Sequence, residues 1–319
     1  MPQAGPGAKP ILCLARPLPG LDRDALAQPL DVRAVPPEGG RAALLDALRA
    51  AQVVVLSYLD RVDEALLAAA PGLRHVASYG VGVNHVDLDA CRRRGVVVTN
   101  TPGVLTDATA DLAMALLLAA ARRVVEGDRL IRAGGWTAVD PGFLLGTEVT
   151  GKTVGVVGFG RIGQAFARRA AGFGMRILYA GPREVDFPGA RRARLEQLLA
   201  GSDVVSLHVP LTPSTENLLS RERLALLRPG AIVVNTARGQ VVDDAALAEA
   251  LASGRVAAAG LDVFRDEPRV PAAYLALPNV VLTPHLGSGS RETREAMSRL
   301  VVEDVLRVAR GEPPRHRVA

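Results

Sequence analysis

Lysine is almost absent from this chain of 319 residues, although its formal net charge is +5 and its isoelectric point is about 9.7. Only Lys9 and Lys152 are lysines, so arginine carries nearly all of the positive charge. The basic runs at 92–94 and 191–194 are short, and no aromatic residues alternate with them to stack on bases. We therefore expect no nucleic-acid partner, whereas a mild positive field would favour small carboxylate or phosphate ligands.

Cysteine and long apolar runs are also scarce. Cys13 and Cys91 have neither the density of a disulfide scaffold nor the spacing of metal ligands, so we expect core thiols and no metal site. The longest apolar run, LAMALLLAAA, falls well short of the roughly 20 residues that span a bilayer. The first twenty residues also lack the apolar segment of a secretory leader. These features predict a cytoplasmic protein with no membrane partner.

What the sequence does contain is a regular alternation of short apolar runs with helical patterns, which is typical of a parallel sheet covered by helices. The first hundred residues hold the runs ILCLA, VVVLS, HVAS and VVVTN. After Lys152 follow TVGVVG, RILYAG, VVSLHV, AIVVNTA, AAAGLDV and VVLTPH. We expect an α/β fold of two doubly wound parallel-sheet domains, the second built on six strands.

The regions between and after these runs predict how the domains are connected. Residues 101–135 read as a turn and one helix of about seven turns, and the last stretch after His285 reads as a single amphipathic helix beginning near Ser290. That helix would pack back on the first module. We expect a flavodoxin-like substrate-binding domain from residues 1–102 and 286–319, an inserted Rossmann domain from 103–285, and a cleft between them.

Residues 158–163, GFGRIG, match the pattern G-x-G-x-x-G directly after an apolar strand and before a helical stretch. Gly158 would permit a tight turn, Gly160 would let the backbone approach a pyrophosphate, and Gly163 would allow the helix to pack closely on the strand. The oriented N–H groups of the helix start would bind the phosphates. The pattern predicts a dinucleotide site that includes Phe159, Arg161 and Ile162.

The next strand end predicts which dinucleotide is bound. An Asp or Glu at this position would bind the ribose 2′-hydroxyl of NAD, but Gly181 and Pro182 stand there and Arg183 follows. A guanidinium without a competing carboxylate favours the 2′-phosphate of NADP(H). The alternative is that Arg183 is a solvated loop residue, and the nearby Glu184 leaves NAD(H) possible.

Two later strand ends, GLDVFRDEP and VVLTPHLGSGS, together with VVNTARGQ, supply three complementary groups. Arg238 could bind a carboxylate through two parallel hydrogen bonds, and His285 could donate a proton near neutral pH. A nearby Glu267 would favour the imidazolium form of that histidine. Each also has a plainer explanation: a surface ion pair, a loop residue before proline, or a structural histidine before glycine.

Over nearly its whole length the chain resembles the D-isomer-specific 2-hydroxyacid dehydrogenases. The resemblance rests on SYGVGVNHVD, VTNTPGVLTDATADLAMALLL, GKTVGVVGFGRIGQAFARRAAGFGMRILY, HVPLT, VVNTARGQVVDDAAL, AAAGLDVF, DEP and NVVLTPHLGSGS. Within that family, the stretches NTPGVLTDATADLAMALLL and GFGMRILY look most like the glyoxylate and hydroxypyruvate reductases. The sequence departs from many members at two places. Asn84 stands where they carry Asp, and the acid expected after the second strand of the Rossmann domain is absent, with Gly181 and Pro182 in its place.

The resemblance implies roles for individual residues. Arg238 would hold the substrate carboxylate and carbonyl, His285 would deliver the proton and Glu267 would pair with it. The backbone N–H groups of Val81 and Gly82 would receive the carboxylate. The implied cofactor contacts further include Thr109, His208, Val209, Pro210, Thr215, Thr236, Ala237, Arg238, Asp262, His285 and Gly287.

The activity implied is reduction of a small 2-oxo acid by NAD(P)H, from glyoxylate to glycolate or from hydroxypyruvate to D-glycerate. Alternatives within the family are a phosphite, formate or other D-2-hydroxyacid dehydrogenase, and a further alternative is a corepressor-like protein that senses nucleotides. The connection that carries Trp136, the only tryptophan, would help to build a homodimer and approach the partner's substrate pocket.

Overall fold

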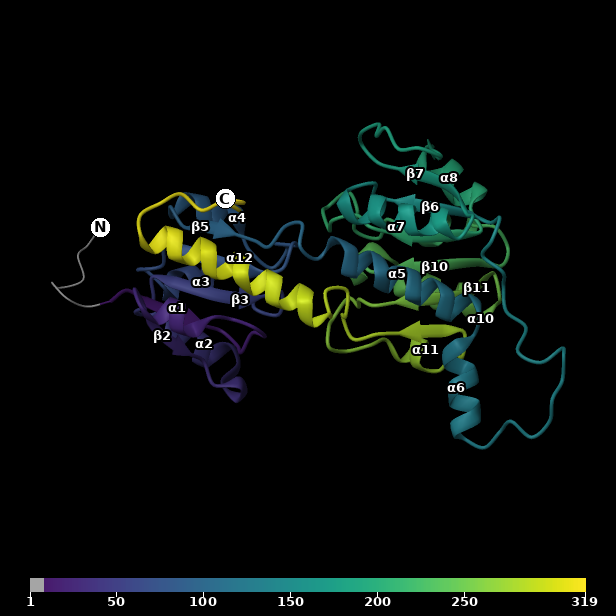
Figure 1. Ribbon diagram of the computed structural model, residues 1–319, viewed down its shortest axis with the longest axis horizontal. Helices are drawn as coiled ribbons and strands as arrows, with labels where there is room; N and C mark the ends of the chain where they lie inside the picture. The colour runs from purple at the N-terminus through teal and green to yellow at the C-terminus, as the bar shows by residue number, and fades with distance from the viewer. Residues whose placement is uncertain (1–8) are drawn as a thin grey trace. The chain divides into compact units, whose positions relative to one another are not determined.

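The computed structural model describes residues 9–319, which form two compact units (Figure 1). One contains the chain up to Leu105 together with Ser290–Ala319, and the other contains Thr106–Gly289. Residues 1–8, on which part of the leader prediction rests, lie outside the described residues. Within the described range, every helix is too short or too polar to cross a membrane.

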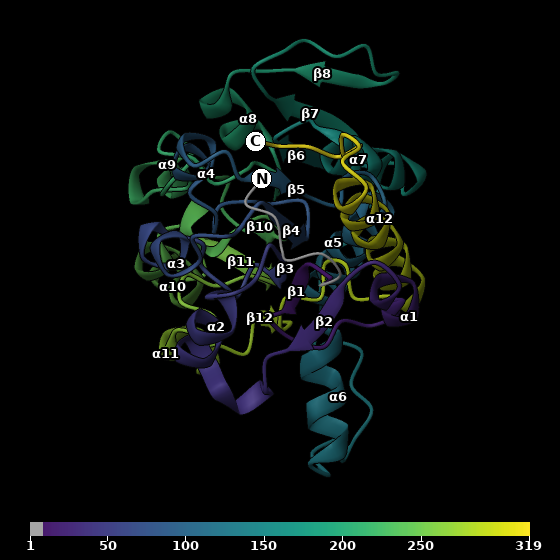
Figure 2. The same cartoon turned by 90° about the vertical axis from the view of Figure 1, so that its left-hand side faces the viewer.

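The first unit is a five-stranded parallel sheet in the order β2-β1-β3-β4-β5, which is the flavodoxin-like order. Its strands are β1 (Ile11–Leu14), β2 (Asp31–Ala34), β3 (Val53–Ser57), β4 (His75–Tyr79) and β5 (Val97–Thr99). Its helices are α1 (Arg23–Ala27), α2 (Gly40–Leu48), α3 (Glu64–Ala69), α4 (Leu88–Arg93) and α12 (Arg291–Ala309), with a 3-10 turn η1 at Pro37–Gly39. Figure 2 shows α2, α3 and α4 on one face of this sheet and α1 and α12 on the other.

The chain after α12 contributes to this sheet, a contact that the sequence did not predict. Arg317 forms an antiparallel bridge with Thr99, and the N–H of Val318 donates to the carbonyl of Val98 over 2.7 Å. Cys13 and Cys91 are buried as expected, and burial raises the pKa of each thiol to about 11.

The second unit is a seven-stranded parallel sheet in the order β12-β11-β10-β9-β6-β7-β8. Its strands are β6 (Thr153–Val157), β7 (Arg176–Ala180), β8 (Ala190–Arg192), β9 (Val204–Leu207), β10 (Ala231–Asn235), β11 (Val256–Leu261) and β12 (Val280–Leu282). Its helices are α5 (Thr106–Ala121), α6 (Val124–Arg132), α7 (Arg161–Gly172), α8 (Leu195–Gly201), α9 (Arg221–Ala225), α10 (Asp244–Ala252) and α11 (Ala272–Leu275), with a 3-10 turn η2 at Gly239–Val241. Sequential strands run outward in opposite directions from β6 and β9, which defines the topological switch point.

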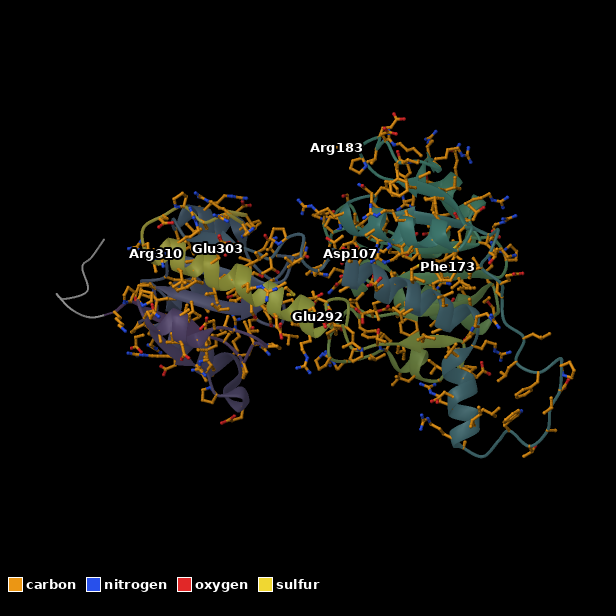
Figure 3. The ribbon with its side chains drawn as sticks, viewed as in Figure 1. Asp107, Phe173, Arg183, Glu292, Glu303 and Arg310 are labelled. Atoms are coloured by element: carbon orange, nitrogen blue, oxygen red, sulfur yellow. The ribbon has the colours of Figure 1, made fainter. Side chains whose placement is uncertain are left out.

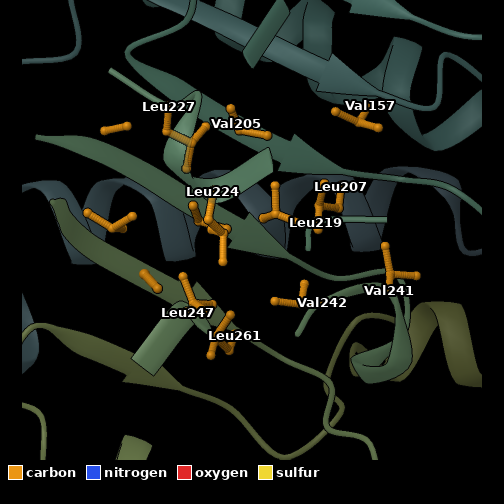
Figure 4. Close-up of a cluster of buried hydrophobic side chains, with 14 of the residues drawn as sticks. Val157, Val205, Leu207, Leu219, Leu224, Leu227, Val241, Val242, Leu247 and Leu261 are labelled. Carbon is orange, nitrogen blue, oxygen red and sulfur yellow. The ribbon is translucent and has the colours of Figure 1, made fainter. Parts of the chain in front are cut away.

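Apolar side chains on both faces of this sheet explain why its central strands are continuous hydrophobic runs. One cluster, shown in Figure 4, includes Val205, Leu207 and Leu247, all at most 1% exposed. A second cluster includes Val154 and Phe166, each fully buried. The two sheets confirm the expected pair of parallel-sheet domains. The expectation of six strands in the second sheet is wrong, because the short, half-exposed edge strand β8 makes seven.

The prediction of one helix of about seven turns is wrong, because the structure has two shorter helices there, α5 and α6. Arg123 adopts a left-handed conformation with φ of 54° and pairs with Glu126 at 2.7 Å. The carbonyl of Ala121, near the end of α5, accepts the N–H of Thr147 over 2.8 Å instead of continuing the helix. The apolar pattern could not show this break, because it depends on a contact from residues far along the chain.

Candidate active site

His285 and Glu267 form a hydrogen-bonded pair beside the carboxyl ends of β11 and β12. His285 Nδ1 lies 2.7 Å from Glu267 Oε2, and both side chains are less than one-fifth exposed. Glu267 Oε1 also accepts the N–H of Phe264 over 3.0 Å, which fixes the carboxylate from its other side. A carboxylate on Nδ1 orients the ring and leaves Nε2 as the nitrogen that can exchange a proton with a substrate.

The charge of Glu267 is maintained by its surroundings. Burial alone would raise the pKa of this carboxyl, but the hydrogen bond from His285, the Phe264 N–H and the charges of His285 and Arg238 together hold it below its ordinary value of 4.5. Glu267 is therefore ionised at neutral pH and presents a negative charge to the Nδ1 side of the His285 ring.

Asp262, at the end of β11, organises the turn that carries His285. One carboxylate oxygen accepts the Thr283 hydroxyl at 2.6 Å and the Leu286 N–H at 2.6 Å, and the other accepts the Gly287 N–H at 2.8 Å. The Asp262 carbonyl accepts the N–H of His285, which has a positive φ of 54°. Burial raises the pKa of Asp262 despite these hydrogen bonds. Asp262, which the resemblance assigns to the nicotinamide, thus also holds the turn that carries His285 in place.

Arg238 follows β10, the strand next to β11. Its turn is shaped by Asn235, which is 1% exposed, donates to the carbonyl of Arg238 over 2.9 Å and accepts the N–H of Ala237 over 3.0 Å. Arg238 Nη1 donates to the carbonyl of Ala237 over 2.6 Å. Sequence reasoning missed Asn235; a polar residue at the end of a buried strand was the available signal.

The glycines of the GFGRIG turn occupy three different environments. Gly158 has φ of 93° and packs against the backbone of His208, and a Cβ on Gly163 would lie only 2.1 Å from the Gly158 carbonyl oxygen. At Gly160, the start of α7, a Cβ would meet no atom within 4 Å. The first and third glycines are therefore required by packing, whereas the second leaves backbone open to a ligand.

These residues fit a bound dinucleotide. The open backbone at Gly160 provides the cradle, and Thr236, 8% exposed at the end of β10, carries a buried hydroxyl that meets no hydrogen-bond partner among the described residues. Thr236 is one of the residues predicted to line the cofactor, and a ligand group would satisfy its hydroxyl.

Arg183 is exposed in the segment after β7 (Figure 3). The backbone of this segment is held by side-chain hydrogen bonds from Tyr179 and Arg192. Among the described residues, Arg183 makes no ion pair or side-chain hydrogen bond. The Tyr179 hydroxyl bonds to both the N–H and the carbonyl of Val185, and Arg192 of β8 donates to the carbonyls of Gly181 and Pro182.

An open pocket at this position is lined in part by Arg192 and Arg194. From the sequence these two arginines were predicted only to belong to a short basic run, because the strand β8 was not predicted.

His208, at the end of β9, is unsuited to proton transfer. Burial lowers its pKa to about 3, its ring lies 5.1 Å from the ring of Phe166, and Nε2 lies 2.9 Å from the Ser206 hydroxyl. The following loop contains Val209 and is closed by Thr215, whose hydroxyl donates to the carbonyl of Pro210 over 2.6 Å. These contacts fix the position of His208 and of the loop that follows β9 at the carboxyl edge of the sheet.

The second unit therefore places most of the predicted residues in one row along the carboxyl edge of its sheet. In strand order the row runs from His285 through Asp262, Thr236 and Arg238, and His208 to Gly158 and Gly181. Thr109, buried on α5, lies close to Gly287. Val81 and Gly82 lie in the first unit, in the loop after β4. No group of three or more potential ligands in residues 9–319 is arranged to hold a metal ion.

A parallel sheet with a dinucleotide turn and a histidine–glutamate pair at its carboxyl edge defines a nicotinamide-dependent oxidoreductase. The sequence profile described as D-isomer specific 2-hydroxyacid dehydrogenase, NAD binding domain, matches residues 114–287. The chain belongs to this family, as its motifs predicted.

Relatives cover nearly the whole chain. It is 48% identical over 282 residues to a glyoxylate reductase of Thermococcus litoralis, covering 86% of this chain and 85% of the relative. A crystal structure of a protein from Thermus thermophilus has a TM-score of 0.90 and 48% identity, with 97% and 99% of the two chains covered.

A third relative was solved with ligands. It is an NADPH-dependent glyoxylate/hydroxypyruvate reductase from Sinorhizobium meliloti in complex with NADP and malonate. It has a TM-score of 0.88 and 34% identity, with 98% of this chain and 97% of that chain covered.

Proposed function

We propose that the protein is an NAD(P)H-dependent reductase of small 2-oxo acids, converting glyoxylate to glycolate, hydroxypyruvate to D-glycerate, or both. The observation that carries this proposal is the His285–Glu267 pair on the same sheet edge as Arg238, whose charge acts on Glu267. The similarity to glyoxylate reductases that cover most of the chain supports the substrate class.

Each side chain has a separate part in the chemistry. When bound, the reduced nicotinamide supplies a hydride to the 2-oxo carbon. His285 donates the proton to the carbonyl oxygen as its charge develops, and the ionised Glu267 stabilises the imidazolium before transfer. Arg238 binds the substrate carboxylate and polarises the carbonyl, and the N–H groups of Val81 and Gly82 receive the carboxylate. Proposed cofactor contacts are the six residues of 158–163, with Thr109, Gly181, Pro182, Arg183, His208, Val209, Pro210, Thr215, Thr236, Ala237, Asp262 and Gly287.

NADP(H) is the favoured cofactor in this proposal. Arg183 is exposed, and the pocket lined by Arg192 and Arg194 adds two guanidinium groups at the same strand end. These three cations suit a 2′-phosphate, because Gly181 and Pro182 occupy the position at which an acid would bind the ribose 2′-hydroxyl of NAD. Arg183→Ala should weaken NADPH binding about tenfold, which corresponds to about 1.4 kcal/mol, and should leave NADH binding nearly unchanged. Arg191→Ala, on the same strand as Arg192, is the matched control; a tenfold preference of the wild-type enzyme for NADH would contradict the assignment.

A homodimer is proposed from the apolar surface around α6. Val124, Ile131, Trp136, Phe143 and Leu145 are between 46% and 69% exposed, although each would favour burial. The matching apolar surface of a second copy would cover them, as in a two-fold interface. Light scattering should give twice the chain mass, and Ile131→Asp should give a monomer, whereas Leu275→Asp, at an exposed leucine on α11, should remain dimeric. A cytoplasmic location stays a prediction.

The activity is tested by a steady-state matrix of NADPH and NADH against glyoxylate, hydroxypyruvate and pyruvate. We expect the highest kcat/KM with NADPH and glyoxylate or hydroxypyruvate. Turnover of phosphite or formate without any 2-oxo acid would favour another member of the family. Cofactor binding without turnover, together with capture of a specific short peptide, would favour the corepressor-like alternative.

A further inference from the structure

The loop after β4 contains two backbone donors without acceptors. Within residues 9–319, the N–H groups of Val81 and Gly82 donate no hydrogen bond, and both residues are half-buried. Resting on the proposed function, in which these groups receive the substrate carboxylate, we infer that Asn100 is the residue that positions them. Asn100 follows β5, the neighbour of β4 in the sheet, so the two strand ends lie side by side.

Two carbonyl groups of this loop, those of Gly80 and Val81, accept hydrogen bonds from the same segment after β5. Asn100 Nδ2 donates to the carbonyl oxygen of Val81 over 2.8 Å, and the N–H of Thr101 donates to the carbonyl oxygen of Gly80 over 3.0 Å. Two consecutive residues after β5 thus bind two consecutive carbonyls after β4.

The direction of the carbonyls determines the direction of the donors. In a planar trans peptide, the C=O and the following N–H point to opposite sides. The Gly80 carbonyl shares its peptide plane with the Val81 N–H, and the Val81 carbonyl shares its plane with the Gly82 N–H. Both N–H groups therefore point away from Asn100 and Thr101, which gives two adjacent donors facing an anion.

Asn100, which holds the Val81 carbonyl, is itself held in place by a backbone hydrogen bond. The backbone N–H of Asn100 donates to the carbonyl of His316 over 3.2 Å, where the end of the chain pairs with β5. At the other end of the loop, Ser78 Oγ lies 3.2 Å from His85 Nε2. Of the two contacts that orient the carbonyls, only the one from Asn100 comes from a side chain, so only that contact can be removed by substitution.

The test compares Asn100→Ala and Asn100→Asp with Asn279→Ala. Asn279 is a matched control, because its half-buried amide also donates to backbone carbonyls, at the opposite, amino-terminal end of a strand in the second unit. A carboxylate bound equally in ground and transition states affects KM rather than kcat. We expect KM for glyoxylate to rise at least tenfold in Asn100→Ala, with kcat within about threefold and an unchanged Kd for NADPH.

Asn100→Asp distinguishes positioning from packing. Aspartate has nearly the same size but presents an acceptor to the Val81 carbonyl, so it should raise KM more than alanine does. A packing role predicts the opposite order, with aspartate close to wild type. KM within twofold of wild type in both variants, or an equal rise in Asn279→Ala, would overturn the inference.

A second measurement does not depend on turnover. The ¹⁵N–¹H signals of Val81 and Gly82 are followed while oxalate is added to the full-length protein. We expect both signals to shift in the wild type and to shift at much higher oxalate concentration in Asn100→Ala. If the enzyme reduces no 2-oxo acid but these shifts occur, the proposed function fails and the inference stands. Wild-type signals that ignore oxalate would refute the inference.

Discussion

Two histidine–carboxylate pairs, one in each unit, have nearly the same geometry and very different surroundings. His285 Nδ1 lies 2.7 Å from Glu267 Oε2, and His316 Nδ1 lies 2.9 Å from Asp304 Oδ2. The imidazoles are similarly accessible, with side-chain exposures of 19% and 21%. The carboxylates differ, since Glu267 is 18% exposed and Asp304 only 1%.

The difference teaches that such a pair is not a catalyst by itself. Asp304 also accepts the N–H of Arg315 over 2.7 Å, so it fastens the end of the chain to α12. Glu267 instead lies within electrostatic reach of Arg238, and its histidine follows a strand end beside the dinucleotide turn. Position on the sheet and the neighbouring cation separate the proposed catalytic pair from the structural one.

The largest expected effect comes from replacing the two histidines. His285→Gln should lower kcat for glyoxylate by about 10²–10⁴-fold, which is the range for loss of a general acid. His316→Gln should leave kcat within about threefold, because its imidazole lies among structural contacts. Stopped-flow and steady-state rates with NADPH measure both, with the NADPH Kd as a control for the integrity of the second unit. Equal losses in the two variants would show that the comparison is wrong.

The cation beside Glu267 gives the next effect. Arg238→Lys keeps the charge but removes the planar pair of donors, so kcat/KM for glyoxylate should fall about 10²-fold, roughly 2.7 kcal/mol. The matched change Arg317→Lys, beside the structural pair, should have no effect beyond about twofold. If Arg238→Lys stays within twofold of wild type, a two-pronged carboxylate contact is excluded.

How far this site follows from the sequence depends on the range of each contact. Gly158, Arg238 and His285 were predictable, because each sits next to an apolar run whose carboxyl end marks the ligand edge of a parallel sheet. Strands β2 and β8 were not, since DVRA and ARR are half-exposed edge segments without apolar alternation. Arg192 was missed for the same reason. The break at Arg123 and the contact from Asn100 to Val81 depend on residues distant in sequence, which local patterns do not contain.

The two carboxylate substitutions should affect stability in the reverse order from activity: Asp304→Asn should lower the free energy of unfolding more than Glu267→Gln does. Asp304→Asn replaces a buried carboxylate that accepts two hydrogen bonds, and the new amide would face one donor with another donor. We expect the free energy of unfolding to fall by about 1–3 kcal/mol, measured by urea denaturation. Glu267→Gln should cost less, because Glu267 is 18% exposed whereas Asp304 is only 1% exposed. A greater loss in Glu267→Gln would mean that the catalytic pair is also the structural one.

The smallest effect concerns the pH dependence of the reaction. The pKa of Glu267 lies below its ordinary value of 4.5, so in the wild type the carboxylate is charged throughout the neutral range. That charge is lost only as the pH falls through the lowered pKa, so kcat/KM for glyoxylate should decline on the acid side only below pH 4.5. Glu267→Gln has no carboxyl group to titrate, so this decline should be absent, and kcat/KM should be about tenfold lower at neutral pH. Asp304→Asn should keep the acid-side decline of the wild type. An unchanged acid-side decline in Glu267→Gln would assign that titration to another group.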